Sequence, residues 1–299
     1  MLTHFLNIIK WKNLLHITVV QFMLKYCFLY GYNFETKLSF VDLILLSITT
    51  TSILASGYLY SYYIDNKKRY MEIFSKDHAV NIAMIFGIVG VFLGTYLSFF
   101  VGKPYYSFIF IIALFALISY YKTVRTKTFF SNIVNSFIRI FSALLVWWFD
   151  YPVSLDSLQL DLFFQVEVIA MSFIAYSFFA NIIRGILYNI KYIDKDHQKK
   201  QQTLPVLLGR KRAKNIANAI LIGLLILTVV ILVLFIKDKF IKAIIFITVI
   251  VPQLWLIYHL SSVDTPKQYE SLFKKSNIAY YFTFLSVPLF TYYFKYVIQ

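Results

Sequence analysis

The chain has 299 residues, of which 60% are hydrophobic and 20% aromatic, whereas only 14% are charged. This composition is too apolar for a water-soluble domain of this size, and it excludes disordered, collagen-like and disulfide-rich secreted chains. The net charge of +15 would suggest nucleic-acid binding in a soluble protein, but here the basic residues separate apolar stretches and are expected to meet lipid headgroups. The sequence therefore predicts an integral membrane protein that binds no nucleic acid.

Nine mostly apolar stretches of about 17 to 25 residues are long enough to cross a bilayer as helices. Their continuous apolar character favours helices over barrel strands, in which apolar and polar residues alternate. The predicted fold class is all-α, a polytopic membrane protein with nine transmembrane helices, and residues 1–299 are predicted to form a single domain. The nine predicted spans begin near Leu14, Phe40, Val80, Ser107, Phe129, Leu162, Ile216, Phe240 and Ala279.

The basic residues predict the orientation, because cytoplasmic loops carry an excess of Lys and Arg. With the N-terminus in the cytoplasm, the basic loops 65–78 and 191–214 fall on that side, and the C-terminus is expected outside. Lys10 and Lys12 precede the first stretch and no small-residue cleavage pattern follows it, so no cleavable signal peptide is predicted. The predicted location is the cytoplasmic (inner) membrane of a bacterium.

Four charged residues fall inside the predicted spans, namely Lys25, Arg139, Glu167 and Arg184. A charge at mid-bilayer costs roughly 2.5 to 3.5 kcal/mol, so such residues normally face protein or a water-filled cavity. Arg139 and Glu167 are expected to form an ion pair. Lys25 is expected to reach the outer interface, or to line a polar pocket with Gln21. Arg184 either snorkels toward the cytoplasmic interface or binds a ligand.

The segment after the sixth predicted span carries the most specific pattern, NIIRGILYNIKYIDKDHQKKQQTLPVLLG. It resembles the UbiA superfamily of intramembrane prenyltransferases, whose helix has the pattern N-x-x-R-E-I-x-x-D-I-x-D-x-x-x-D followed by T-L-P-x-x-x-G. Three acidic positions differ, because Gly185 stands in place of Glu, and Asn189 and Tyr192 stand in place of Asp. The matching residues are Asn181, Arg184, Ile186, Ile190, Asp196, Thr203, Leu204, Pro205 and Gly209.

Further segments extend the resemblance over most of the chain. KWKNLL is similar to the family's R-P-x-N opening, with Lys10 and Asn13 in register. YYKTVRTKTFFSN resembles its Y-S-x-x-L-K stretch, with Arg125 in the place of the Lys and Asn132 matched. The segment GYLYSYYID at the end of the second span keeps only Asp65 of the family's N-D-x-x-D-x-x-x-D motif. The other positions of that motif are occupied by Gly57, Tyr58 and Ser61.

The resemblance implies transfer of an isoprenyl chain from an isoprenyl diphosphate to a hydrophobic acceptor, such as a quinone precursor or a glycerol phosphate lipid, in contact with membrane lipid. The paired acidic motifs of such enzymes hold Mg²⁺, which takes oxygen ligands and bridges to the diphosphate. Asp65, Asp194 and Asp196 are the implied metal ligands here, for a single Mg²⁺ or for none. The implied diphosphate-binding residues are Arg125, Arg184, Lys122 and Asn189, and the implied acceptor-pocket residues are Asn13 and Asn181.

Two other functions remain open at this point. The loss of most motif carboxylates is also typical of a catalytically impaired family member, which would bind an isoprenoid, a lipid or a partner protein in the old cavity. A small membrane transporter, from a different class, would use Lys25, Arg139 and Glu167 along a polar path.

Overall fold

The computed structural model describes residues 2–64, 76–125, 130–198, 200–236, 238–263 and 265–298, and all regular secondary structure within these ranges is helical. The predicted all-α fold is therefore confirmed. The chain divides into two compact units, which are described separately. Unit 1 comprises Met1–Thr126 and Phe141–Asp156, and unit 2 comprises Lys127–Ile140 and Ser157–Gln299. The single domain stays a prediction.

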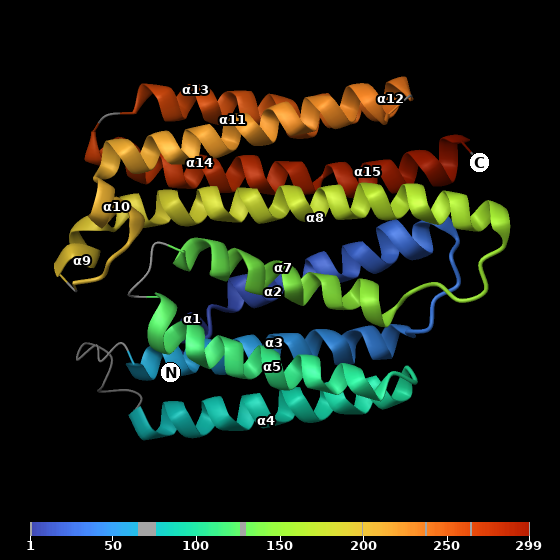
Figure 1. Ribbon diagram of the computed structural model, residues 1–299, viewed down its shortest axis with the longest axis horizontal. Coiled ribbons are helices and arrows are strands. Elements are labelled where there is room, and N and C mark those ends of the chain that lie inside the picture. The colour runs from blue at the N-terminus through green and yellow to red at the C-terminus, as the bar shows by residue number, and fades with distance from the viewer. Residues whose placement is uncertain are drawn as a thin grey trace. The chain divides into compact units, whose positions relative to one another are not determined.

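Unit 1 consists of two N-terminal helices followed by longer ones that pack side by side (Figure 1). Two of its helices continue into π-helical segments, so each is longer than its α-helical part. The elements are α1 (Leu2–Ile8), α2 (Trp11–Met23) with the π-helical segment Leu24–Leu29, α3 (Phe40–Ile64), α4 (Lys76–Phe100), α5 (Ser107–Ser119) with the π-helical segment Tyr120–Val124, and the second half of α7 (Ser131–Phe149).

Helix α4 approaches its neighbours closely at two glycines. A Cβ atom added to Gly90 would lie 2.6 Å from Ile53 on α3, and one added to Gly94 would lie 2.4 Å from the ring of Phe110 on α5. Hydrophobic burial contributes little between helices in lipid, so helix pairs depend on close van der Waals packing at small residues. These glycines therefore set the spacing of α3, α4 and α5.

Unit 2 is built around the long helix α8, against which α11 and α14 pack (Figure 1). Its core is largely aliphatic and includes Ile183 and Leu187 from α8, Leu221 from α11 and Leu260 from α13. The elements are the first half of α7, α8 (Ser157–Lys191), α9 (Ile193–Gln198), α10 (Leu204–Leu208), α11 (Arg210–Leu234), α12 (Lys239–Ile245) with the π-helical segment Phe246–Ile250, α13 (Val251–Ser262), α14 (Pro266–Phe284), α15 (Ser286–Tyr293) and the π-helical segment Phe294–Ile298.

Eight helical segments of the described residues are long and apolar enough to cross a membrane. Each begins within six residues of the start of one of the first eight predicted spans. The ninth predicted span falls on α14 and α15, where a turn at Leu285 separates the two helices and the first turns of α14 carry charged residues. The eight segments are Trp11–Tyr32, Phe40–Ile64, His78–Phe100, Pro104–Val124, Ser131–Phe149, Ser157–Lys191, Arg210–Leu234 and Lys239–Ser262.

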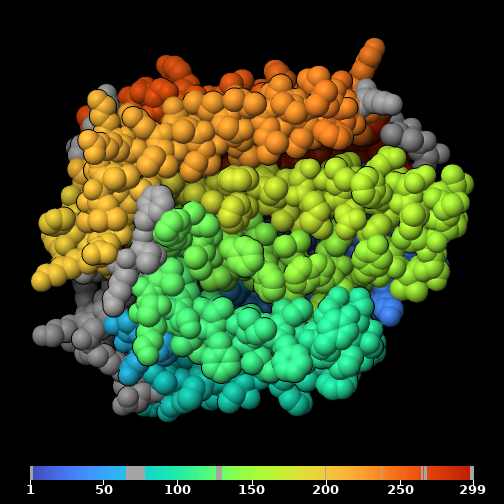
Figure 2. Space-filling model, viewed as in Figure 1, coloured from blue at the N-terminus to red at the C-terminus, as the bar shows by residue number. Residues whose placement is uncertain are grey.

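The outward faces of these helices are apolar. Helix α11 lies on the surface of unit 2 over most of its length (Figure 2), and Ile226, Val233 and Leu234 on it are exposed. Helix α4 of unit 1 likewise exposes Ile88 and Phe92. Contiguous apolar surfaces of this kind suit lipid and would be unstable in water. The chain is therefore an integral membrane protein.

Lys25 lies among polar groups inside unit 1, and its position relative to the outer interface stays a prediction. Its side chain is buried in unit 1, where the Nζ atom lies 2.5 Å from Oδ2 of Asp150 and donates to the carbonyl oxygen of Leu38. The other carboxylate oxygen of Asp150 accepts from the backbone N–H of Leu38 at 2.7 Å. Gln21, one turn earlier, donates to the Ser142 carbonyl at 2.8 Å. These polar contacts connect α2, the loop before α3 and the end of α7.

Candidate functional site

Arg184 projects into unit 2 from α8. Its Nε atom donates to Oδ1 of Asn277 at 2.8 Å, and its terminal nitrogen donates to Oδ1 of Asn181 at 3.2 Å. The guanidinium lies 4.3 Å from the ring centre of Tyr280 and 5.6 Å from that of Tyr281, both on α14. Hydrogen bonds to two amide oxygens and stacking on aromatic faces both favour the charged guanidinium. Arg184 is therefore held inside the unit and does not snorkel to lipid.

A second arginine in unit 2 lies within electrostatic range of the first. Arg139, on the first half of α7, interacts electrostatically with the guanidinium of Arg184 and with the hydroxyl of Tyr280. Its Nε atom is buried and has no hydrogen-bond partner among the described residues. Glu167 lies 17 positions before Arg184 on α8, about 25 Å along the helix at 1.5 Å per residue. The predicted ion pair between Arg139 and Glu167 is therefore wrong, and Arg139 lies near another cation instead.

Neutral side chains occupy two of the positions where the family pattern has carboxylates. Asn189 donates from Nδ2 to Oδ1 of Asn132 at 3.3 Å. One turn earlier on α8, a Cβ atom added to Gly185 would lie 2.9 Å from the same Asn132 oxygen. Asn132 therefore occupies the space beside α8 that a family Glu side chain would need. The diphosphate-binding role of Asn189 stays a prediction.

The two aspartates on α9, Asp194 and Asp196, contact different residues. Oδ2 of Asp194 lies 2.6 Å from a terminal nitrogen of Arg210, and the Asp194 side chain is 81% exposed. Oδ2 of Asp196 accepts a long hydrogen bond of 3.4 Å from Thr203, the residue that precedes α10. Both contacts connect α9 to the T-L-P segment and to the start of α11. Their role in the described structure is to hold this loop together.

The described residues do not fit a Mg²⁺ site. Mg²⁺ takes oxygen ligands in near-octahedral geometry and is bound in proteins chiefly through carboxylates. No group of three or more His, Cys, Asp or Glu side chains that could hold a metal ion occurs in the described ranges. Asp65, the third predicted ligand, lies outside the described residues. The metal-binding roles of Asp65, Asp194 and Asp196 therefore stay predictions.

In unit 1, cations lie against the neutral residues that replace the first acidic motif. Arg125 donates from its guanidinium to the Ser61 hydroxyl and lies 5.7 Å from the ring centre of Tyr121. Lys10 lies 4.8 Å from the ring centre of Tyr58. Lys10 adopts a left-handed conformation with φ 52° between α1 and α2, which a non-glycine residue rarely does. The resemblance to the family opening places Lys10 in register but implies no role for it.

The other three predicted site residues are Asn13 and Lys122 in unit 1 and Asn181 in unit 2. Asn13 lies half-buried in the first turn of α2, where its backbone N–H donates to the Lys10 carbonyl at 2.7 Å. Lys122 is exposed on the π-helical segment after α5. Asn181 lies beside Arg184 and also donates to the Tyr280 hydroxyl at 3.4 Å. The structure therefore brings Asn181 and Arg184 together within unit 2.

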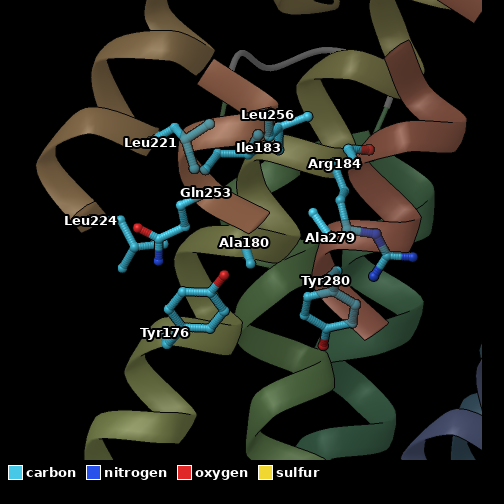
Figure 3. A pocket seen from close by; sticks show the side chains of 11 residues that line it. Tyr176, Ala180, Ile183, Arg184, Leu221, Leu224, Gln253, Leu256, Ala279 and Tyr280 are labelled. Carbon is cyan, nitrogen blue, oxygen red and sulfur yellow. The ribbon is translucent and has the colours of Figure 1, made fainter. Parts of the chain in front are cut away.

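A small cavity in unit 2 extends from Arg184 toward α11 and α13 (Figure 3). Tyr176 and Gln253 direct their polar ends toward it, and Arg184 lies beside Tyr280 at its other end. Its volume of about 20 Å³ is room for about one water molecule. Oε1 of Gln253 is buried and has no hydrogen-bond partner among the described residues. The cavity therefore suits a buried water and is too small for an isoprenyl chain.

Sequence reasoning missed the residues of α14 that hold Arg184. Asn277, Tyr280 and Tyr281 have the spacing i, i+3 and i+4, which puts their side chains on one face of a helix. A polar amide followed by two tyrosines on one face of an otherwise apolar segment was the available signal. It lies 93 residues from Arg184 along the chain, so only the fold shows that the two segments meet.

Comparisons with known proteins agree with this architecture. The model of the UbiA prenyltransferase family matches residues 26–286. No match was found among curated proteins by sequence. A structure of digeranylgeranylglyceryl phosphate synthase has a TM-score of 0.68 at 15% identity, with 97% of this chain and 98% of that chain covered.

Two further solved structures share the fold. An apo UbiA homologue from Aeropyrum pernix K1 has a TM-score of 0.63 at 12% identity, with 91% of this chain and 96% of that chain covered. A UbiA homologue from Archaeoglobus fulgidus bound to GPP and Mg²⁺ has a TM-score of 0.59 at 11% identity, with 95% and 99% covered. The structural matches establish the fold, and the family model covers most of the chain. This chain belongs to the UbiA prenyltransferase family.

Proposed function

We propose that the protein transfers an isoprenyl chain from an isoprenyl diphosphate to a lipid-soluble acceptor. The observation that carries this proposal is Arg184, which matches the family pattern and is held inside unit 2 by Asn181, Asn277 and Tyr280. Related folds bound to GPP and to DMAPP support the donor class. Quinone precursors and glycerol phosphate lipids are the proposed acceptors, and the proposed location is a bacterial inner membrane.

The proposed role of Arg184 is electrostatic. When the allylic carbon–oxygen bond of the donor breaks, the electron pair moves to the diphosphate, which leaves with additional negative charge. A fixed guanidinium in a dry environment stabilises this charge more strongly than water does. The faces of Tyr280 and Tyr281 carry negative electrostatic potential and can stabilise a nearby carbocation. The acceptor then attacks the allylic carbon and loses a proton.

We infer the same roles for the other predicted residues. Asn189 in unit 2 is proposed to contact phosphate, and Asn181 to contact the acceptor as well as Arg184. In unit 1, Arg125 and Lys122 are the proposed phosphate-binding residues, and Asn13 is the proposed acceptor residue. Arg125 donates a hydrogen bond to the Ser61 hydroxyl, and this contact places a positive charge beside the first motif. The contact supports a phosphate-binding role for Arg125.

Prenyl transfer in membranes tests the proposal. Membranes containing the protein are supplied with labelled isoprenyl diphosphates of several chain lengths and with candidate acceptors, with and without Mg²⁺. Arg184→Ala is expected to lower turnover at least tenfold, because a charge-assisted hydrogen bond contributes about 1.5–3 kcal/mol. Asp196→Ala tests the predicted metal ligand in the same assay. Arg212→Gln, which removes an exposed arginine at the start of α11, is the matched control. Unchanged turnover in both Arg184→Ala and Asp196→Ala would overturn the site assignment.

A non-catalytic family member is the second candidate. The replacement of motif carboxylates by Gly185 and Asn189, and the contact of Asp194 with Arg210, specifically favour it. Such a protein would bind isoprenyl diphosphate with the same dependence on Arg184 but release it unchanged. Binding without turnover for every donor and acceptor would therefore favour this candidate. The transporter alternative loses support, because Lys25 is buried against Asp150 and Arg139 lies beside Arg184.

A further inference from the structure

Two arginines in unit 2 lie within electrostatic range of each other inside a membrane protein. Arg184 and Arg139 interact electrostatically with each other and with the hydroxyl of Tyr280. Within the described ranges, neither forms an ion pair with a carboxylate. Two like charges repel each other, and the repulsion is stronger where the surroundings are apolar. An anion bound next to both guanidiniums would remove this cost.

The register of α7 against α8 also indicates that Arg139 lies near Arg184. Asn132 and Asn189 are hydrogen-bonded, and Asn132 also lies against Gly185. Arg139 follows Asn132 by seven residues, or about two helical turns. Because the two helices run in opposite directions (Figure 1), two turns along α7 correspond to two turns back along α8, toward Asn181. Side chains on α7 tilt toward its N-terminus, which brings the Arg139 guanidinium toward Arg184.

The hydrogen-bonding capacity of the pair is only partly used. Nε of Arg139 is buried without a hydrogen-bond partner in the described part of the chain. Arg184 uses Nε and one terminal nitrogen for the two amide oxygens of Asn277 and Asn181, and Tyr281 is a third hydrogen-bond partner. Each guanidinium has five N–H donors in a planar fork that matches phosphate oxygens. A buried donor without an acceptor is costly, so an oxygen-rich anion suits this place.

We propose that Arg139 and Arg184 together form a binding site for a phosphorylated lipid, and that the two guanidiniums hold its phosphate group without a divalent cation. Arg139 is outside the family pattern that identified Arg184. The ligand is either the diphosphate of an isoprenyl donor or the phosphate of a glycerol phosphate acceptor, which share the same oxygen chemistry. This inference rests on the proposed function for the identity of the ligand.

Binding to the purified full chain tests the site. Inorganic pyrophosphate is titrated in excess EDTA, with intrinsic tryptophan fluorescence or calorimetry as the readout. Binding is expected without Mg²⁺ and is expected to weaken at least about tenfold in both Arg139→Gln and Arg184→Gln. Arg212→Gln, which removes the same charge from an exposed position, should leave binding unchanged. Binding that requires Mg²⁺, or that is unaffected by Arg139→Gln, overturns the proposal.

A second variant tests the site if the first one does not fold. If Arg139→Gln does not yield folded protein, Arg139→Lys keeps the charge and removes the planar fork. Its binding is expected to weaken severalfold, because Lys cannot form two parallel hydrogen bonds to one phosphate. Wild-type affinity in the lysine variant, measured on protein with an unchanged unfolding temperature, contradicts the proposed geometry.

The two ligand sources are separated by parallel titrations. Geranyl diphosphate tests the donor, and detergent-dispersed phosphatidic acid tests a glycerol phosphate lipid. Weakened binding of either ligand in Arg139→Gln supports the site and identifies its source, and binding of neither overturns it. The prenyl-transfer assay is scored separately. If ligands bind in an arginine-dependent way but no prenyl transfer occurs, the proposed function is wrong and the site remains supported. If transfer occurs, is unaffected by Arg139→Gln, and no ligand binds without metal, only the proposed site is wrong.

Discussion

Individual buried charges in this protein have contrasting surroundings. The ammonium of Lys25 is compensated by the carboxylate of Asp150, the Leu38 carbonyl and the Thr36 hydroxyl. Arg184 is surrounded instead by amide oxygens and aromatic rings. The charges of Lys25 and Asp150 compensate each other, so the pair is expected to have a structural role. Arg184 keeps donors for a ligand, which is the pattern expected of a binding site.

Removing one partner of the Lys25–Asp150 pair should destabilise the protein strongly. Lys25→Met leaves the Asp150 carboxylate buried without its counterion, a loss of about 3–5 kcal/mol in the free energy of unfolding. Unfolding in detergent, followed by tryptophan fluorescence, measures the loss. The double variant Lys25→Met with Asp150→Leu removes both charges and should be more stable than the single variant. If the two substitutions destabilise additively, the pair is not coupled as described.

At the scale of helices, unit 1 depends on close approach and unit 2 on side-chain contacts between helices. Gly90 and Gly94 allow α4 to approach α3 and α5. In unit 2, α8 and α14 meet through Arg184 with Asn277 and through Lys191 with Glu270. We therefore expect the stability of unit 1 to be sensitive to added volume at these glycines, and the stability of unit 2 to depend on the pH.

Gly94→Ala tests the close approach. The added methyl group would lie 2.4 Å from the ring of Phe110, which is fully buried and cannot move aside cheaply. Overpacking of this kind costs about 1–3 kcal/mol. Gly223→Ala in α11 is the matched control, because nothing lies within 4 Å of the added carbon. Thermal unfolding of both variants in the same detergent should show a loss for the first only. Equal unfolding temperatures would contradict the packing described for α4.

The Lys191–Glu270 contact predicts a pH dependence. The Lys191 ammonium, 2.9 Å from Oε1 of Glu270, holds the pKa of this carboxyl below its ordinary value by hydrogen bonding and charge. A lowered pKa in the folded state contributes stability above the ordinary pKa, and this contribution is lost as the pH falls through the folded pKa.

The difference in unfolding temperature between wild type and Glu270→Gln should therefore be present at neutral pH and disappear well below about pH 4. A pH series of both proteins measures it. Because the Glu270 side chain is 55% exposed, solvent screens the pair and the difference should be small. A difference that persists in acid would show that the ion pair is not its source.

The sequence predicts helix positions well and contacts between helices poorly. The starts of eight spans follow from local apolar runs, and the motif around Arg184 is also local. The partners of Lys25 and Arg184 lie 125 and 93 residues away, and nothing in a local pattern connects them. A pairing of Arg139 with Glu167 follows from sequence only because both are charges within predicted spans, whereas in the fold Arg139 is near Arg184, about 25 Å along α8 from Glu167. Asn277 meets Arg184 because α14 packs on α8, and this packing is not visible in the local sequence.

For the whole molecule, the number of membrane crossings decides the side on which the chain ends. Eight spans would return the C-terminus to the side of the N-terminus, and nine would place it on the opposite side. The distribution of basic residues predicts nine, with α14 and α15 forming the last crossing. A C-terminal alkaline phosphatase fusion is therefore expected to be active, and a C-terminal green fluorescent protein fusion dark. The reverse result would mean that α14 and α15 do not cross.

The separation of Lys25 from Asp150 also bears on synthesis. Translation at about 5–20 residues per second takes roughly 6 to 25 seconds to cover the 125 residues between them. During this interval the first hydrophobic segment carries an ammonium group whose counterion has not been made. A ribosome-bound intermediate that ends before residue 150 should therefore keep this segment at the edge of the insertion machinery, and release it into lipid only when the later helix arrives.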